Sequence, residues 1–115
     1  MRTGKDLLMG ETARDIYCEA VNETHVDSNW YRRGFTCERR CDRPGQTWSD
    51  YAHDVDELVM LVEGEIEVEM KGKIHKLRPG QELLVPASVP HTIRNVGSTH
   101  AVWLKGMAMD HAYTD

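Results

Sequence analysis

Three side chains of the kinds that bind divalent metals lie near one another in the sequence. His53 and Glu57 are four residues apart, and His91 follows a segment that contains two prolines. Two imidazoles and a carboxylate that converge from two strands would form a facial triad with open coordination positions. Tyr51 is two residues before His53, so on a strand both side chains project to the same face and the phenol could approach as a fourth group. By spacing alone, the same histidines could equally be hydrogen-bonded structural residues.

The segments that must position these candidate ligands are predicted to be short strands. Apolar and acidic residues alternate strictly over 65–70, which predicts a half-buried strand whose glutamates form a solvated face. Residues 71–73 have turn chemistry, and 74–77 is expected to be the return strand of a hairpin. The apolar run 58–62 ends at a Glu-Gly turn signal and is predicted to be a strand buried on both faces. Further strands are expected over 82–85, 91–96 and 101–106.

The first part of the chain has weaker patterns. A strand is expected near Ala13–Ala20, with Leu7–Ala13 a short helix or an arm, and β-forming residues favour a strand within 33–41. No segment has a convincing amphipathic helical pattern. Short strands separated by Gly and Pro turns predict an all-β sandwich or barrel. We expect one domain over 1–115, with an N-terminal arm at 1–12 and a C-terminal tail at 110–115.

Composition excludes several partners. The 115-residue chain has a formal net charge of −5 and a sequence pI near 5.6, which argues against nucleic acid or an anionic membrane as the main partner. The absence of a long apolar run predicts a cytoplasmic protein without a membrane span. The three cysteines, Cys18, Cys37 and Cys41, are expected to be reduced thiols.

Two longer motifs add a family resemblance. Residues 45–64, with Gly45, Tyr51, His53, Glu57 and Gly64 in order, resemble the first cupin motif, G-x5-H-x-H-x3-4-E-x6-G. Residues 80–95 resemble the second, G-x5-P-x-G-x2-H-x3-N. The resemblance implies a jelly-roll-like β-barrel, usually a homodimer, with one divalent metal in its mouth. Carried over by position, the metal ligands would be His53, Glu57 and His91.

The sequence departs from the cupin pattern at two positions. Ser88 replaces a turn glycine, and Tyr51 replaces the first histidine of the first motif. Tyr51 could bind the metal as a phenolate, stand off it as a catalytic proton donor or acceptor, or pack beside a three-ligand site. Loss of metal is a further alternative, because some relatives with degraded motifs keep only the fold.

The resemblance implies a metal-dependent enzyme of dioxygenase or isomerase type that acts on a small polar molecule, with Fe, Mn, Zn or Ni as the metal. The alternative is a non-catalytic module that binds a metal or a small ligand.

Other charged residues near the motifs have open interpretations. Asp54 and Asp56 flank His53 and are either solvated or acceptors for a histidine ligand. An arginine-rich segment could bind a substrate carboxylate if its strand lines the barrel, or else form an exposed face. Its members are Arg32, Arg33, Arg39, Arg40 and Arg43.

Overall fold

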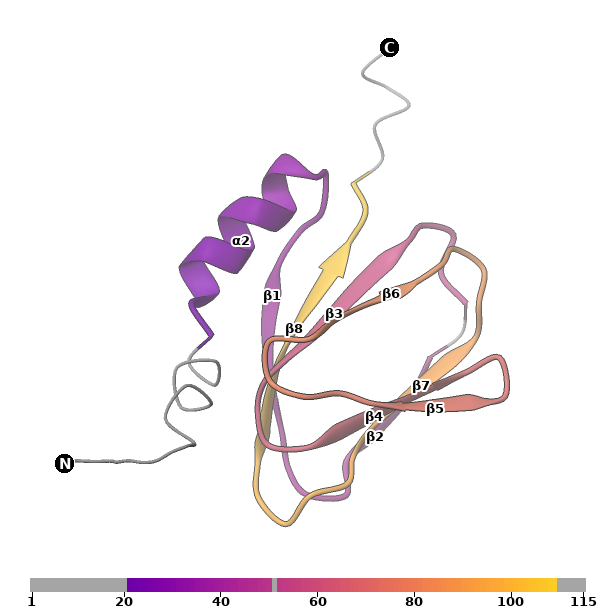
Figure 1. Cartoon of the computed structure of the whole chain (residues 1–115). Coiled ribbons are helices and arrows are strands. Elements are labelled where there is room, and N and C mark those ends of the chain that lie inside the picture. Colours follow the sequence, from indigo (N-terminus) through magenta and orange to yellow (C-terminus); the bar gives the residue numbers. More distant parts are fainter. Residues whose placement is uncertain (1–20, 51, 110–115) are drawn as a thin grey trace, which may run out of the picture.

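Two four-stranded antiparallel sheets face each other in the computed structural model, which describes residues 21–50 and 52–109. One sheet has the order β1-β8-β3-β6 and the other β2-β7-β4-β5 (Figure 1). The strands are β1 Glu38–Asp42, β2 Thr47–Asp50, β3 Glu57–Glu63, β4 Ile66–Met70, β5 Lys73–Lys76, β6 Glu82–Val85, β7 His91–Asn95 and β8 Ala101–Met107. The prediction of an all-β barrel is confirmed, and so are the strands expected after residue 57.

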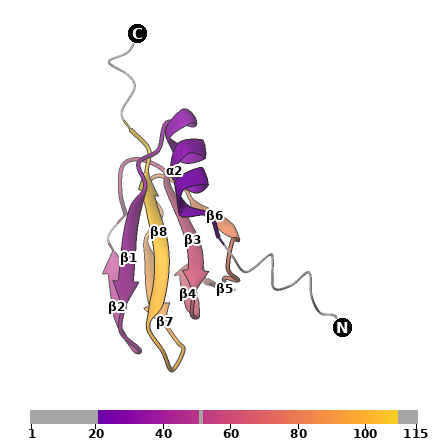
Figure 2. The ribbon, with the colours of Figure 1, turned by 90° about the vertical axis from the view of Figure 1, so that its left-hand side faces the viewer.

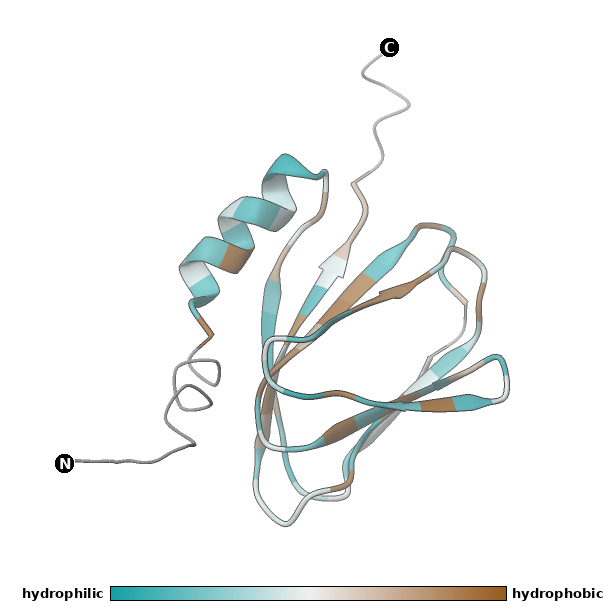
Figure 3. Cartoon of the chain, in the orientation of Figure 1, coloured by the Kyte–Doolittle hydropathy of each residue, from teal (hydrophilic) through white to brown (hydrophobic). Residues whose placement is uncertain are grey.

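The inner faces of the sheets form the main core. On β4, Ile66, Val68 and Met70 are buried, whereas Glu67 and Glu69 alternate with them on the outer face. This is the period-two pattern expected of a strand with one buried face. Strand β3 is buried through Leu61 on both faces, because a helix covers the outer side of its sheet. In Figure 3 the hydrophobic stretches lie mainly along β3, β4, β6 and β8.

A buried aspartate joins the two sheets at one end of the barrel. Trp48 on β2 and Trp103 on β8 each donate an indole N–H to Oδ2 of Asp42, at 2.9 and 2.8 Å. Asn95, the last residue of the second motif, donates from Nδ2 to the backbone oxygen of Asp42 at 3.2 Å. Because buried polar groups are costly without partners, these bonds fix the ends of β1, β2, β7 and β8 relative to one another.

The helix α2, Glu23–Arg32, covers the outer face of the β1-β8-β3-β6 sheet (Figures 1 and 2). The expectation that the chain has no convincing amphipathic helix is therefore wrong. The segment is mostly polar, and its buried face depends on Val26 and the fully buried Trp30, one turn apart. Asn22 caps the helix, since its Oδ1 accepts the His25 backbone N–H at 3.0 Å.

Packing of α2 requires a glycine on the strand below it. A Cβ atom at Gly106 would lie 2.7 Å from Cε3 of Trp30 and 2.6 Å from the backbone oxygen of Thr36. Real Cβ atoms do not approach other atoms this closely, so the indole can reach the sheet only over a residue without a side chain. Gly106 therefore allows the large aromatic anchor of the helix to be completely buried.

The start of the chain differs from expectation. Residues 31 and 32 end α2, and β1 begins only at Glu38, so the strand expected within 33–41 is shorter and later than predicted. Between the helix and β1, Gly34 has a φ of 91° and Phe35 forms an isolated antiparallel bridge with Ala108. The arm, helix or strand expected within 1–20 and the tail at 110–115 lie outside the described residues. No helix among the described residues is long and apolar enough to cross a membrane.

We expect Glu82→Gln to lower the free energy of unfolding at pH 7 by about 1 kcal/mol. Glu82 on β6 accepts from Arg33 at 2.7 Å and from Nε1 of Trp30 at 3.0 Å. The hydrogen bond from Arg33 lowers the pKa of the Glu82 carboxyl. Its stabilising effect is thus complete above the unfolded pKa of about 4.3 and is lost as the pH falls through the lower folded pKa.

Urea titrations of the parent and the Glu82→Gln variant at several pH values test this expectation. The difference in unfolding free energy between them should shrink as the pH falls below about 4. A difference that grows with acidity would contradict the assignment.

Candidate metal centre

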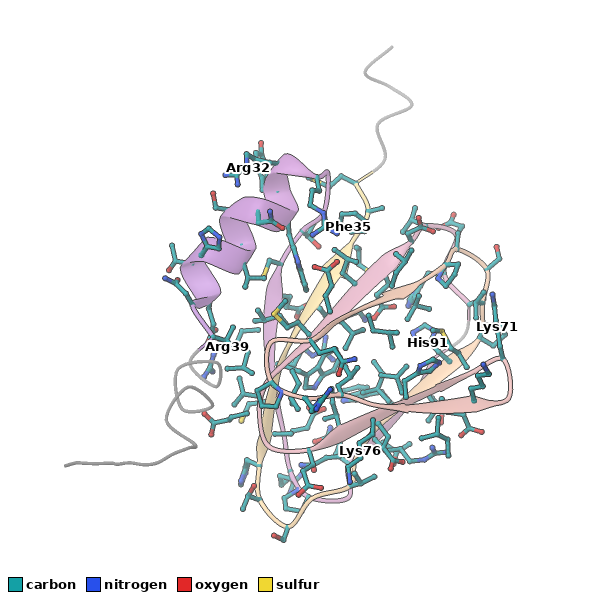
Figure 4. All side chains as sticks on the ribbon, viewed as in Figure 1. Arg32, Phe35, Arg39, Lys71, Lys76 and His91 are labelled. Carbon is teal, nitrogen blue, oxygen red and sulfur yellow. The ribbon has the colours of Figure 1, made fainter. Side chains whose placement is uncertain are left out.

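Three potential metal ligands converge at one end of the barrel. His53, Glu57 and His91 each offer one ligand atom, and these three atoms lie within 4.8 Å of one another. Nε2 of His91 is 3.0 Å from Oε1 of Glu57, and Nε2 of His53 is 3.8 Å from the same oxygen. The His91 side chain lies between the two sheets (Figure 4). The structure thus brings together all three residues that the sequence selected as ligands.

The tautomer of His91 leaves the correct nitrogen facing this centre. Its Nδ1 lies 3.1 Å from the backbone oxygen of Val89, and a carbonyl can only accept, so Nδ1 carries the proton. A neutral His91 therefore points the lone pair of Nε2 at the Glu57 carboxylate. That arrangement is favourable if Nε2 is also protonated or if a cation lies between the two groups. Orientation of a ligating histidine by a backbone carbonyl is typical of metal sites.

The Glu57 carboxylate is buried more deeply than is usual for a carboxylate with a purely structural role. The Glu57 side chain is 1% exposed, and it opens β3, where the four residues that follow are also buried. A buried carboxylate is costly unless it is paired or binds a metal. Two imidazoles and one carboxylate are also the donor set preferred by Fe²⁺ and related ions. The residues present therefore fit a divalent metal.

His53 reaches the centre from a loop and not from a strand. Strand β2 ends at Asp50 and β3 begins at Glu57, so the expected strand parity between Tyr51 and His53 does not apply to His53. Tyr51 lies outside the described residues, and its role stays a prediction.

Two contacts hold the His53 loop against the loop that precedes His91. The backbone N–H of Ser88 donates to the backbone oxygen of His53 at 2.6 Å. Ser88 has φ of 67°, the left-handed conformation that glycine adopts most easily, which explains why glycine is the usual residue there. Oδ1 of Asp56 accepts the backbone N–H of Ala87 at 2.7 Å. Asp56 is thus a positioning residue, a role the sequence did not distinguish from a solvated carboxylate.

Asp56→Ala is expected to weaken metal affinity about 10-fold without unfolding the barrel. The substitution removes the acceptor that links the loops on either side of the centre, so the ligand atoms must be ordered when the metal binds. Competition with a coloured zinc chelator measures the affinity, and circular dichroism checks the fold. Asp54→Ala, at the exposed neighbouring aspartate, is the matched control and should leave the affinity unchanged. Equal affinities in the two variants would contradict the positioning role.

The arginine-rich segment does not act as one surface. Arg33 bonds to Glu82 and Arg39 to Glu23, whereas the guanidinium of Arg40 lies 4.8 Å from the ring centre of Trp48. Arg40 therefore faces the inside of the barrel and the other two face outward.

Cys37 packs beside the helix on the outer face of its sheet, away from the candidate ligands. Burial, followed by the charges of Asp27 and Glu23, raises the pKa of its thiol to about 11. Cys37 and Cys41 are both free cysteines, as expected, whereas Cys18 is outside the described residues.

Comparison with known proteins identifies the family. The family model named Cupin_2, described as a cupin domain, matches residues 40–106, which is more than half of the chain. This chain belongs to the cupin family. The match includes all three residues of the candidate metal centre.

Two curated relatives resemble this cupin over part of their length. "Polyketide synthase CurC" of Streptomyces cyaneus is 40% identical over 60 residues, which is 51% of this chain and 39% of that protein. "Protein SchB" of Streptomyces halstedii is also 40% identical over 60 residues, covering 44% of its length. The chain thus matches about two-fifths of the length of these relatives.

Solved structures support the fold. The TT1209 protein of Thermus thermophilus is 28% identical, with a TM-score of 0.61 over 65% of this chain and 72% of that chain. The Cupin_2 domain of an XRE-family transcriptional regulator from Enterobacter cloacae is 23% identical, with a TM-score of 0.62 over 70% of this chain and 88% of that chain.

Proposed function

We propose that this cupin is a metal-dependent enzyme. It binds one divalent metal through His53, Glu57 and His91 and acts on a small molecule that chelates this metal. The observation that supports the proposal is the convergence of one fully buried carboxylate and two imidazoles within 4.8 Å. Fe, Mn, Zn and Ni all accept this donor set, so the ligands do not select one of them.

The metal, when bound, would act as a Lewis acid or as a centre for oxygen chemistry. Such ions take four to six ligands, so three protein ligands leave positions for water, for substrate or for Tyr51. The hydrogen bond from Nδ1 of His91 to the backbone oxygen of Val89 orients the ring so that Nε2 faces the site. In this proposal Tyr51 gives or takes a proton at the bound molecule.

The class of substrate is suggested by one relative. The protein named "Polyketide synthase CurC" shares 40% identity over 60 residues, and polyketide chains contain repeated 1,3-dicarbonyl units. A 1,3-dicarbonyl chelates a divalent metal through two oxygens and readily loses the proton between them. An isomerase-type or dioxygenase-type reaction at such a unit would fit a metal site with open coordination positions.

Water exchange at the metal tests the enzymatic proposal. In protein loaded with Mn²⁺, fast exchange of bound water should enhance the proton relaxation rate of the solvent well above that of free Mn²⁺. Addition of acetylacetone, a simple 1,3-dicarbonyl, should then reduce the enhancement as it displaces water. Bound Mn²⁺ without enhancement would mean a closed coordination sphere and would favour a non-catalytic binding module over the enzyme.

A further inference from the structure

An amine lies on the inner face of the barrel beside the candidate metal centre. Lys105 on β8 is directly opposite Val59 on β3, and Val59 belongs to the inner core. Residues opposite each other on paired strands project to the same face, so Lys105 points inward. Val59 is two residues from Glu57, which places Lys105 one strand across and about 7 Å along the sheet from the buried carboxylate.

The surroundings of Lys105 are partly closed. Strand β8 lies between β1 and β3, so Lys105 is one strand in from the edge of its sheet. Lys105 is half-buried, and no ion pair within 4.0 Å joins it to another of the described residues. Its neighbour on β1, Glu38, contacts Arg40 instead, at 3.4 Å. An inward, half-buried lysine that makes no ion pair of its own is costly for folding.

Arg40 adds a second inward cation. Its guanidinium lies 4.8 Å from the ring centre of Trp48 and 5.7 Å from that of Trp103, between the two sheets. Trp48 pairs with Ile93 on β7, and Ile93 is two residues from His91. Inward-facing residues on a strand are two apart, so Trp48 and Arg40 lie next to the inward-facing position of His91. The side chain is only 22% exposed, and its Nη1 lies 3.4 Å from Oε2 of Glu38, whose side chain is 63% exposed. The nearby Asp42 is already bonded to both indoles.

We propose that Lys105, assisted by Arg40, binds an anionic group of the molecule that chelates the metal, so that the substrate is a carboxylate or similar anion and not a neutral chelator. This inference rests on the proposed function. A divalent ion with one carboxylate ligand has a net charge of +1, and Lys105 adds another positive charge one row away. Together they favour a ligand that has a chelating end and an anionic group about 8 Å from it.

Two stable probes that differ by one carboxylate test the inference. Catechol chelates a metal through two oxygens, and 3,4-dihydroxybenzoate has the same chelating end with a carboxylate on the far side of the ring. We expect Zn²⁺-loaded parent protein to bind 3,4-dihydroxybenzoate at least 10-fold more tightly than catechol by calorimetry. Lys105→Met should abolish most of this preference and leave catechol affinity unchanged, and Arg40→Met should reduce it.

Control variants separate the anion site from general charge effects. Lys105→Arg keeps the charge and should retain the preference. Lys71→Met removes one positive charge at the exposed β4–β5 turn and should behave as the parent. A preference unchanged in Lys105→Met, or no preference in Zn²⁺-loaded parent, overturns the inference alone. If the parent takes up none of Fe²⁺, Mn²⁺, Zn²⁺ and Ni²⁺, the proposed function is overturned and the inference with it.

Thermal stability gives a readout that needs no probe. If Lys105 is retained for a ligand, Lys105→Met should raise the Tm of Zn²⁺-loaded protein by a few degrees, because it removes an inward charge next to a cation. A clear fall in Tm would mean that Lys105 is a structural residue and would overturn the inference.

Discussion

His91→Ala is expected to lower the affinity of the protein for Zn²⁺ by at least about 100-fold. Loss of an outer-shell partner alone costs 10- to 100-fold, and His91 is placed to bind the metal directly. Its Nε2 faces the Glu57 carboxylate at 3.0 Å, and its Nδ1 is fixed by the backbone oxygen of Val89. Competition with a chelator of known zinc affinity measures the change.

A matched histidine provides the control for this variant. His100→Ala lies in the exposed turn before β8 and should bind Zn²⁺ as tightly as the parent. Circular dichroism should show the same strand content in both variants. Equal zinc affinity in His91→Ala and the parent would contradict the placement of the metal at this centre.

Trp30→Ala is expected to lower the free energy of unfolding by about 3–5 kcal/mol. The indole is fully buried against Leu58, Met60 and Leu104, and its Nε1 donates to Glu82. Removal leaves a cavity under α2 and takes one donor from the carboxylate. Because small domains are stable by about 5–15 kcal/mol, this loss would bring the fold near its limit.

Urea unfolding of Trp30→Ala beside Tyr31→Ala tests the role of the helix. Tyr31 is the next residue but is 69% exposed, so its removal should change stability by less than about 0.5 kcal/mol. Similar losses in the two variants would mean that α2 does not depend on Trp30 for its packing.

Much of the fold could be predicted because the strands after residue 57 follow simple patterns. Alternation over 65–70 and the Lys71-Gly72 turn, with φ of 53° and 75°, identify the β4–β5 hairpin. The continuous apolar run in β3 indicated burial on both faces, and the structure has that burial. The three candidate ligands were accessible to sequence reasoning because their spacing within the two cupin motifs is preserved.

The remaining features depend on contacts between distant residues. Helix α2 was not predicted because a single fully buried residue, Trp30, anchors it. The space that Trp30 occupies on the sheet depends on Gly106, more than 70 positions later. The role of Asp56 is visible only once the Ala87 backbone lies beside it, 31 positions along the chain. Arg40 points inward because Trp48 and Trp103, on different sheets, meet at Asp42. Contacts of this kind between distant residues leave no pattern in the local sequence.

The metal content of the purified protein is the most direct test of the central proposal. The protein should be loaded separately with Fe²⁺, Mn²⁺, Zn²⁺ and Ni²⁺, freed of excess ion, and measured by plasma mass spectrometry beside His53→Ala, His91→Ala and Tyr51→Phe. We expect close to one equivalent of at least one metal in the parent and loss of that metal in both histidine variants. Retention in Tyr51→Phe would mean that Tyr51 is not a required ligand and would leave proton transfer or packing as its role. A parent that retains none of the four ions would contradict the proposed metal centre.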